Sequence, residues 1–153
     1  DRNIIFVHGY GQLGRFVPDE LKKAGIDIEN TKNLFVSEYI YDMAKYMAAA
    51  DLVISRAGAS SLAEIQALGK AAVLVPSPYV SENHQYHNAM ALQEKNAAVV
   101  IEQKELDSEK VSVILEELLA DREKYQIIGK NARNMALTNA KKHICDIVLS
   151  LIK

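Results

Sequence analysis

Short apolar runs, each closed by polar or turn-forming residues, recur along this chain of 153 residues. The runs cover residues 4–7, 34–36, 52–54, 72–75 and 97–101. A continuous apolar run of this length is typical of a strand that is buried on both faces of a sheet. The pattern therefore predicts five short, buried strands.

Segments with helical spacing of apolar residues lie between and after these strands. Four of them, residues 18–24, 42–49, 61–68 and 85–95, alternate with the strands, and Gly25 and Gly69 end the first and third. From Asp107 onward the pattern is helical only, with breaks expected near Ala120 and Leu137. The alternation predicts an α/β, Rossmann-like fold: a parallel sheet with helices on both faces and a helical C-terminal tail that packs against it.

Composition argues against nucleic-acid binding and a membrane span but does not identify the function. The chain is 49% hydrophobic and 25% charged with a net charge of −2, which suits one domain over residues 1–153 and gives no basic field for nucleic acid. No apolar run approaches the roughly 20 residues that span a bilayer. The single cysteine, Cys145, lies among Ile144 and Val148 at helical spacing, so we expect it in the core of a cytoplasmic protein.

Gly9, Gly11 and Gly14 spell G-x-G-x-x-G directly after the first predicted strand. In a dinucleotide-binding fold, such glycines open a long helix whose N-terminus faces a pyrophosphate. Here Pro18 falls in the interior of that helix and fits the first position of a shorter helix instead. Lys32 also occupies about the place of the acid that would hold the ribose. We therefore expect a turn-forming loop, no NAD or NADP, and no other cofactor.

The most informative stretch follows the third predicted strand. Gly58 allows a tight turn at the carboxyl end of that strand, where open α/β sheets bind ligands. Ser60 and Ser61 then present hydroxyls and free amides at a helix N-terminus, which suits a diphosphate, and Arg56 adds a full charge nearby. Glu64, one turn into the helix, can reach a pair of vicinal hydroxyls such as those of ribose.

A second polar turn follows the fourth predicted strand, and His84, Gln85 and Asn88 open the helix after it. Their imidazole and amide groups suit the hydroxyls of a sugar. Each feature also has a purely structural explanation: residues 61–64 spell a capping box, Arg56 can be a surface ion-pair partner, and residues 84–88 can be a polar helix entrance. The combination on one edge of one sheet favours a nucleotide-sugar site.

These motifs resemble the donor-binding signature of the MurG family, the peptidoglycan N-acetylglucosaminyltransferases that make lipid II. The resemblance runs from about Ile4 to the end of the chain and rests on R-A-G-A-S-S-x-x-E from Arg56, Pro76, and H-Q-x-x-N-A from His84. It implies an inverting transfer from UDP-N-acetylglucosamine in a two-domain GT-B fold without a bound metal. The implied donor-binding residues are Tyr39, Ile40 and Met43 at the uracil, Ala59, Ser60 and Ser61 at the diphosphate, Glu64 at the ribose, and His84 and Gln85 at the sugar, with Arg56, Gly58 and Asn88 beside them.

The sequence departs from the family in two ways. Ala71 stands where family members usually have proline, which we expect to affect only a turn. The acceptor-binding half and the first strand and glycine loop of the donor half are missing, so we expect a fragment that is truncated at its N-terminus and inactive alone. The catalytic base cannot be named, because the acceptor half would supply it, and His8 is expected to shape the donor cleft.

Two other functions remain open. A UDP-sugar 2-epimerase uses the same fold and a similar glycine-serine-glutamate segment, and a split glycosyltransferase has a non-catalytic donor-binding subunit. The transferase reading implies a lipid I acceptor bound through the missing half and a parent protein that is peripheral on the inner face of the cell membrane. The incomplete sheet edge is also expected to favour self-association.

Overall fold

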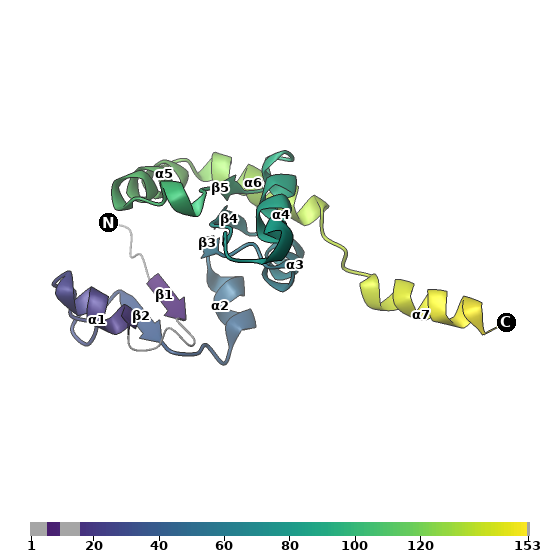
Figure 1. Ribbon diagram of the computed structural model, residues 1–153, viewed down its shortest axis with the longest axis horizontal. Coiled ribbons are helices and arrows are strands. Elements are labelled where there is room, and N and C mark those ends of the chain that lie inside the picture. The colour runs from purple at the N-terminus through teal and green to yellow at the C-terminus, as the bar shows by residue number, and fades with distance from the viewer. Residues whose placement is uncertain (1–5, 10–15, 153) are drawn as a thin grey trace. The chain divides into compact units, whose positions relative to one another are not determined.

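The computed structural model describes residues 6–9 and 16–152 of the chain. It forms two compact units, residues 1–48 and residues 49–153, which are described here one after the other (Figure 1). Each unit has its own parallel sheet. The parallel pairing is as predicted, but the sequence predicted one sheet and the described strands form two.

The first unit pairs strand β1 (Phe6–Gly9) in parallel with strand β2 (Leu34–Ser37). Helix α1 (Phe16–Lys23) connects the two strands, and helix α2 (Met43–Ala49) follows β2. The predicted strands and helices of this region are therefore present. The glycine motif lies mostly outside the described residues, since only Gly9, at the end of β1, is included.

Helix α1 begins at Phe16, two residues before the predicted start at Pro18. Pro18 is thus the third helical residue and not the first. It still lies in the first turn, where backbone N–H groups have no partner within the helix, so its ring removes no hydrogen bond. The helix ends as predicted at Gly25, whose φ of 77° lies in the left-handed region that glycine adopts without strain.

The second unit contains a three-stranded parallel sheet in the order β3-β4-β5. Strand β3 spans Leu52–Ser55, β4 spans Ala71–Leu74 and β5 spans Val99–Val100. All four residues of β4 are buried, as expected for a central strand. Ala71 is the first of them, so the expectation that its departure from proline affects only a turn is wrong: it is 3% exposed and belongs to the core.

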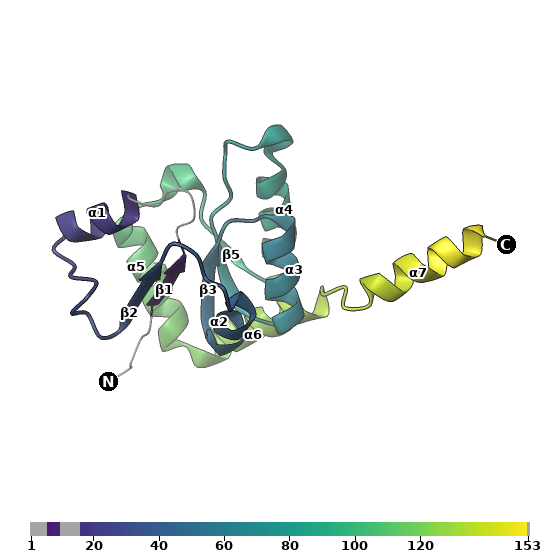
Figure 2. The ribbon, with the colours of Figure 1, turned by 90° about the horizontal axis from the view of Figure 1, so that it is seen from below.

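Five helices of the second unit surround or follow this sheet. They are α3 (Ala59–Leu68), α4 (His84–Gln93), α5 (Ser108–Ala120), α6 (Arg122–Asn134) and α7 (Ala140–Leu151), with short 3-10 turns η2 (Ser81–Asn83) and η3 (Gln103–Glu105). Helices α3 and α4 lie on one side of the sheet and α5 and α6 on the other (Figures 1 and 2). The predicted parallel sheet with helices on both faces is thereby confirmed.

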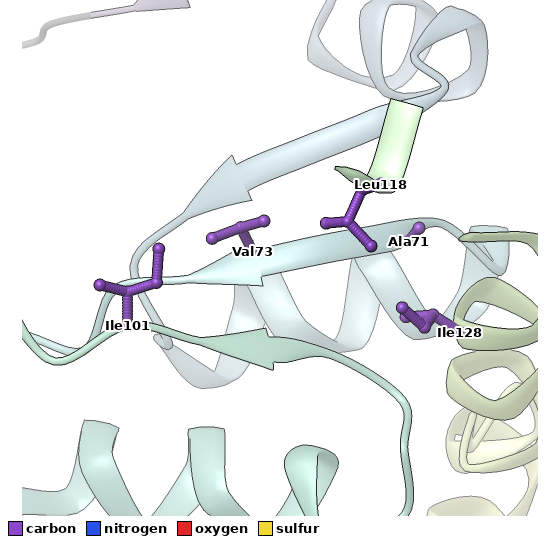
Figure 3. Packing of buried hydrophobic residues seen from close by; sticks show 5 residues of the cluster. All are labelled: Ala71, Val73, Ile101, Leu118 and Ile128. Carbon is purple, nitrogen blue, oxygen red and sulfur yellow. The ribbon is translucent and has the colours of Figure 1, made fainter. Parts of the chain in front are cut away.

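The core forms where α5 and α6 cover β4. Ala71 and Val73 of β4 pack with Ile101, with Leu118 of α5 and with Ile128 of α6 (Figure 3). Because side chains alternate along a strand, the residues of β4 between and after these two face α3 and α4 instead. The all-apolar sequence of β4 follows from this two-sided burial.

The breaks between the last helices have local causes. Asp121 ends α5 and caps α6, because its carboxylate accepts a hydrogen bond from the Lys124 amide at 2.9 Å. Asp107 caps α5 in the same way through the Glu109 amide. The second break covers residues 135–139, so the breaks predicted near Ala120 and Leu137 are confirmed.

Helix α6 makes a close contact with the turn between α3 and β4. Gly69 ends α3 with a φ of 63°, and its backbone lies against Gly129 of α6. A Cβ on Gly129 would collide with the Gly69 carbonyl oxygen and lie 3.3 Å from the Ala71 nitrogen. Only glycine at position 129 allows the helix to approach the sheet this closely.

Helix α7 differs from the other helices, because every one of its residues is exposed. Ile144, Ile147 and Leu151, which share one side of the helix, are 61%, 60% and 80% exposed. Cys145 is exposed as well, so its predicted place in the core is wrong: the apolar spacing predicted the helix but not what covers it. Among the described residues, no helix has the length and hydropathy to cross a membrane.

Candidate functional site

The N-terminus of α3 lies just beyond the carboxyl end of β3 and has no side-chain cap. Gly58 is its N-cap residue, and the first hydrogen bond of the helix runs from the Leu62 amide to the Gly58 carbonyl at 3.0 Å. The amides of Ala59, Ser60 and Ser61 therefore have no partner within the helix. Such a terminus combines free N–H donors with partial positive charge, which favours an anion.

The capping-box explanation of Ser61 and Glu64 is wrong. Helix α3 begins at Ala59, two residues before the predicted start, so Ser61 is its third residue and cannot cap it. Glu64 is exposed, and within the described part of the chain its carboxylate has no hydrogen bond or ion pair. Both side chains are therefore available to a ligand at this end of the helix.

Gly58 does not serve the tight turn that the sequence suggested. Its φ of −71° and ψ of 143° are extended values that any residue adopts. A Cβ placed on it would have no atom within 4 Å among its described neighbours. Neither the backbone nor the packing requires glycine here, which leaves the close approach of a ligand to the backbone as a physical reason for it.

Arg56, directly after β3, is held by neutral groups. Its Nη1 donates hydrogen bonds to the Val75 carbonyl at 3.1 Å and to Oε1 of Gln103 at 2.7 Å. The surface ion pair considered for Arg56 is absent from the described residues, where no carboxylate lies within ion-pair distance of it. Its charge therefore stays uncompensated, and its Nη2 and Nε have no partner among those residues.

The polar turn before α4 is built by two of the predicted site residues. Oε1 of Gln85 accepts a hydrogen bond from the Ser77 amide at 2.9 Å, and Nδ1 of His84 lies 2.9 Å from the Ser81 carbonyl. Glu82 and Asn83 have φ values of 53° and 51°, an uncommon conformation for residues other than glycine. These contacts leave the Gln85 amide nitrogen free to donate to a ligand.

Asn88 connects this turn with the start of α3. Its Nδ2 donates a hydrogen bond to the Ala57 carbonyl at 3.2 Å, one residue before Gly58. The structure thus brings together the two polar turns that the sequence placed on one edge of the sheet.

Tyr39, Ile40 and Met43 belong to the other compact unit. Tyr39 is 64% exposed, and its ring meets that of Tyr41 edge-on, with the centroids 5.0 Å apart. The Ser37 hydroxyl donates to the Tyr39 carbonyl at 2.8 Å, which fixes the backbone before Ile40. Ile40 is half-buried and Met43 is exposed. The side chain of His8 lies outside the described residues.

A cavity of about 320 Å³ lies beside the polar turn of α4. Its lining residues come from the segments after β4 and β5, which include η2 and η3, and from α4; they are Pro76, Pro78, Tyr79, Asn83, Tyr86, Glu102, Gln103 and Lys104. No group of three or more His, Cys, Asp or Glu side chains within residues 6–9 and 16–152 is placed to hold a metal ion.

Sequence reasoning missed Gln103 and the main-chain groups of Val75 and Ser77. No motif marks Gln103, which lies 47 residues after Arg56. Its place follows from β5 lying next to β4, since the carboxyl ends of parallel neighbours meet at one edge of the sheet.

The model of the glycosyltransferase family 28 C-terminal domain matches residues 2–146 of this chain. The chain belongs to this family. Two relatives, from Desulforamulus reducens and Acetivibrio thermocellus, are both named UDP-N-acetylglucosamine--N-acetylmuramyl-(pentapeptide) pyrophosphoryl-undecaprenol N-acetylglucosamine transferase. The first is 39% identical, and the match covers 99% of this chain and 41% of that relative's length. The second is 46% identical, and the match covers 79% of this chain and 33% of that relative's length.

Solved structures agree with this family 28 assignment. The crystal structure of MurG from Acinetobacter baumannii superposes with a TM-score of 0.77 at 31% identity, covering 94% of this chain and 42% of that one. The glycotransferase of kitacinnamycin, at 17% identity and a TM-score of 0.63, shares the fold. The predicted resemblance to MurG and to the C-terminal domain of a GT-B transferase is confirmed. The chain spans about 41% of the length of the Desulforamulus relative.

Proposed function

We propose that this chain binds UDP-N-acetylglucosamine as the donor half of an inverting N-acetylglucosaminyltransferase that makes lipid II of peptidoglycan. The observation that carries the proposal is the uncapped N-terminus of α3, with bare backbone at Gly58 and an Arg56 guanidinium that meets no carboxylate among the described residues. Both features suit a diphosphate. The names of the two relatives support UDP-N-acetylglucosamine as the sugar nucleotide.

The donor would be held in parts by different segments. The amides and hydroxyls at Ala59, Ser60 and Ser61 would bind the diphosphate, and the free carboxylate of Glu64 would accept hydrogen bonds from the ribose hydroxyls. His84 and Gln85 would bind the N-acetylglucosamine, and Asn88 would hold the turn that precedes α3. The Ile40 backbone, with Tyr39 and Met43, would bind the uracil.

The chemistry assigned to this half is stabilisation of the leaving group. In an inverting transfer, the acceptor hydroxyl attacks the anomeric carbon from the face opposite UDP, and negative charge develops on the departing diphosphate. Donors fixed in place before the reaction, such as the amides of α3 and the guanidinium of Arg56, stabilise that charge without reorganising. We expect no metal ion and no other cofactor. In such a transferase, residues outside the region matched here would bind the acceptor and supply the base that deprotonates it.

The relatives are named for an undecaprenol-linked acceptor, so we propose that the parent protein acts on lipid I at the inner face of the cell membrane. We also propose that the isolated chain self-associates. Within the described part, β3 pairs only with β4, and Ile54 on this edge strand is 44% exposed.

The test is a titration of the isotope-labelled chain with UDP-N-acetylglucosamine, UDP, CDP and ADP, followed by amide NMR. We expect weak binding of the two uridine nucleotides, with the largest shifts at residues 58–61 and 39–43, and much weaker binding of CDP and ADP. Equal binding of all four nucleotides would contradict a uridine site. Epimerisation of UDP-N-acetylglucosamine without an acceptor would favour the 2-epimerase reading instead.

A further inference from the structure

Gln103 is the only side chain that the described residues place in a hydrogen bond with Arg56. Its Oε1 accepts from Nη1 of Arg56 at 2.7 Å, and the Val75 carbonyl accepts from the same nitrogen at 3.1 Å. Gln103 begins the 3-10 turn η3, which follows β5, whereas Arg56 follows β3. The bond therefore joins the carboxyl ends of the two outer strands of this sheet.

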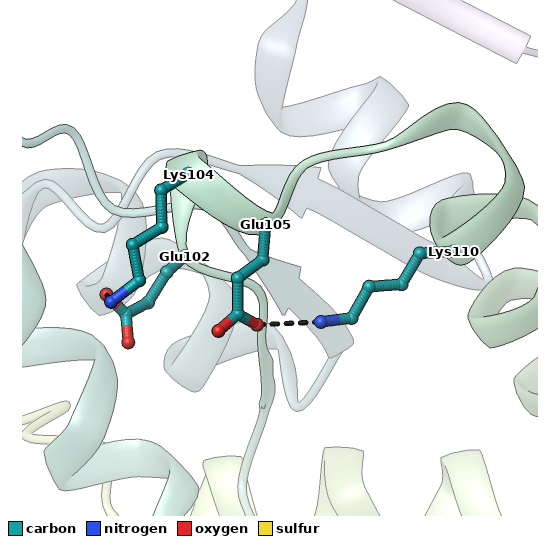
Figure 4. Close-up of polar contacts among 4 residues, drawn as sticks. All are labelled: Glu102, Lys104, Glu105 and Lys110. Carbon is teal, nitrogen blue, oxygen red and sulfur yellow. Dashed lines mark hydrogen bonds and ion pairs between the residues drawn. The ribbon is translucent and has the colours of Figure 1, made fainter.

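The carboxylates on either side of Gln103 have lysine partners of their own. Glu102 lies 3.0 Å from the Lys104 ammonium, and Glu105 lies 2.7 Å from that of Lys110 (Figure 4). The hydrogen bond from Lys110 lowers the pKa of Glu105, and the one to Glu102 raises the pKa of Lys104. Each carboxylate next to Gln103 thus has a lysine partner, and Arg56 meets the one uncharged polar side chain in the 102–105 segment.

This choice of partner has an electrostatic consequence. A carboxylate at position 103 would form a charge-assisted pair with the guanidinium and compensate its charge. An amide fixes the same group in place but leaves its positive charge for another ligand. Because both acceptors use Nη1, the N–H groups on Nη2 and Nε are left without partners among the described residues.

We propose that Gln103 is a positioning residue for Arg56, and that its neutrality keeps the guanidinium charge available to the diphosphate of the donor. Gln103 itself need not touch the ligand. The inference rests on the proposed function, since it assumes that an anionic nucleotide binds beside Arg56.

The experiment measures the dissociation constants of UDP and of uridine by calorimetry, at low and high salt, for the wild-type chain and for Gln103→Glu and Gln103→Met. The first variant keeps the length of the side chain and adds a charge, and the second keeps the length and removes the acceptor. Gln126→Glu, on the exposed surface of α6, adds the same charge elsewhere and is the matched control. Circular dichroism and urea unfolding verify that each variant is folded.

We expect Gln103→Glu to weaken UDP binding about tenfold or more at low salt, with a smaller salt dependence, while uridine binding stays unchanged. Gln103→Met should weaken UDP binding less than Gln103→Glu, and neither variant should add to the loss caused by Arg56→Ala. Gln126→Glu should match the wild type.

Two results would overturn the inference alone, and a third would also contradict the proposed function. Unchanged UDP binding by Gln103→Glu would show that its neutrality is irrelevant. Equal losses of UDP and uridine binding would indicate a general structural defect and not a charge effect. If the wild-type chain binds uridine but not UDP, or neither of them, the proposed function itself fails and this inference with it.

Discussion

The side-chain amide of Asn88 in α4 donates a hydrogen bond to the main-chain carbonyl of Ala57, 3.2 Å away and 31 residues earlier in the sequence. Ala57 is fully buried and directly precedes Gly58, the N-cap of α3. The bond therefore fixes the backbone from which the free amides of α3 emerge. Asn88, which the sequence suggested as a sugar ligand, uses one of its donors to build the site.

We predict that Asn88→Asp lowers both the stability and the UDP affinity of the chain. A carboxylate would replace the donor and face a carbonyl oxygen, at a cost of about 1 to 3 kcal/mol. The matched control is Asn131→Asp in α6, which loses a similar bond to the Asn96 carbonyl, 3.0 Å long. Urea unfolding should give similar losses for the two variants, whereas calorimetry should detect weaker UDP binding only for Asn88→Asp. If Asn88→Asp and Asn131→Asp bind UDP with equal affinity, Asn88 does not help to form the site.

Glu64→Ala should weaken UDP binding by about ten- to a hundredfold, because it removes charge-assisted hydrogen bonds worth about 1.5 to 3 kcal/mol. The folding stability should change little, since Glu64 makes no hydrogen bond or ion pair with any described residue. Glu116→Ala on the exposed surface of α5 is the control.

The same Glu64 variants should respond differently to deoxyribose analogues of UDP. The wild type should lose affinity when a ribose hydroxyl is removed, whereas Glu64→Ala should lose almost none, and Glu64→Gln should fall between them. Equal losses in wild type and variant would mean that Glu64 does not hold the ribose.

Substitutions at Gly58 should separate folding from binding. Gly58→Ala meets no steric conflict with the described residues and keeps an allowed φ, so we expect the free energy of unfolding to change by no more than about 1 kcal/mol. UDP affinity should fall about tenfold or more, because the added methyl group would occupy the space assigned to the diphosphate. Gly58→Ser should be at least as stable as Gly58→Ala, since its hydroxyl can cap α3, yet bind UDP no better. A Gly58→Ala chain with wild-type UDP affinity would place the diphosphate elsewhere.

Gly129→Ala should destabilise the chain, because its Cβ would collide with the Gly69 carbonyl oxygen. Overpacking of this kind costs about 1 to 3 kcal/mol, and both partners here are backbone that cannot move aside as a side chain can. Lys130→Ala, at the exposed neighbouring position, should have little effect in the same urea titration. Wild-type stability of Gly129→Ala would mean that α6 does not pack this closely on the turn after α3.

The elements that could be predicted from sequence are those whose causes are local. The five strands are short apolar runs, and Gly25 and Gly69 end helices with φ values that glycine favours. Asp107 and Asp121 cap the helices that follow them through their own carboxylates. The sequence pattern predicts a start of α3 that is two residues too late. Ser61 and Glu64 have the spacing of a capping box, whereas the true N-cap residue, Gly58, has no side chain that could mark it.

The parts of the site that escaped prediction depend on tertiary contacts. Whether Arg56 meets a carboxylate or an amide is decided by the order of β3, β4 and β5 and not by its sequence neighbours. The prediction that Cys145 is buried failed for a related reason. An apolar spacing predicts which side of α7 is hydrophobic but not which other element, if any, packs against it. Roles of single residues toward the donor remain predictions from the motif.

The open space in front of Gly58 bears on how an inhibitor of this site could lose its effect. Any glycine codon becomes an alanine codon by one base change, and the described residues leave room for a methyl group at this position. A compound that derives its potency from close contact with the Gly58 backbone would therefore select for that change. If the same space holds the donor diphosphate, as proposed, the resistant form would also bind its donor more weakly, so resistance would carry a cost in activity.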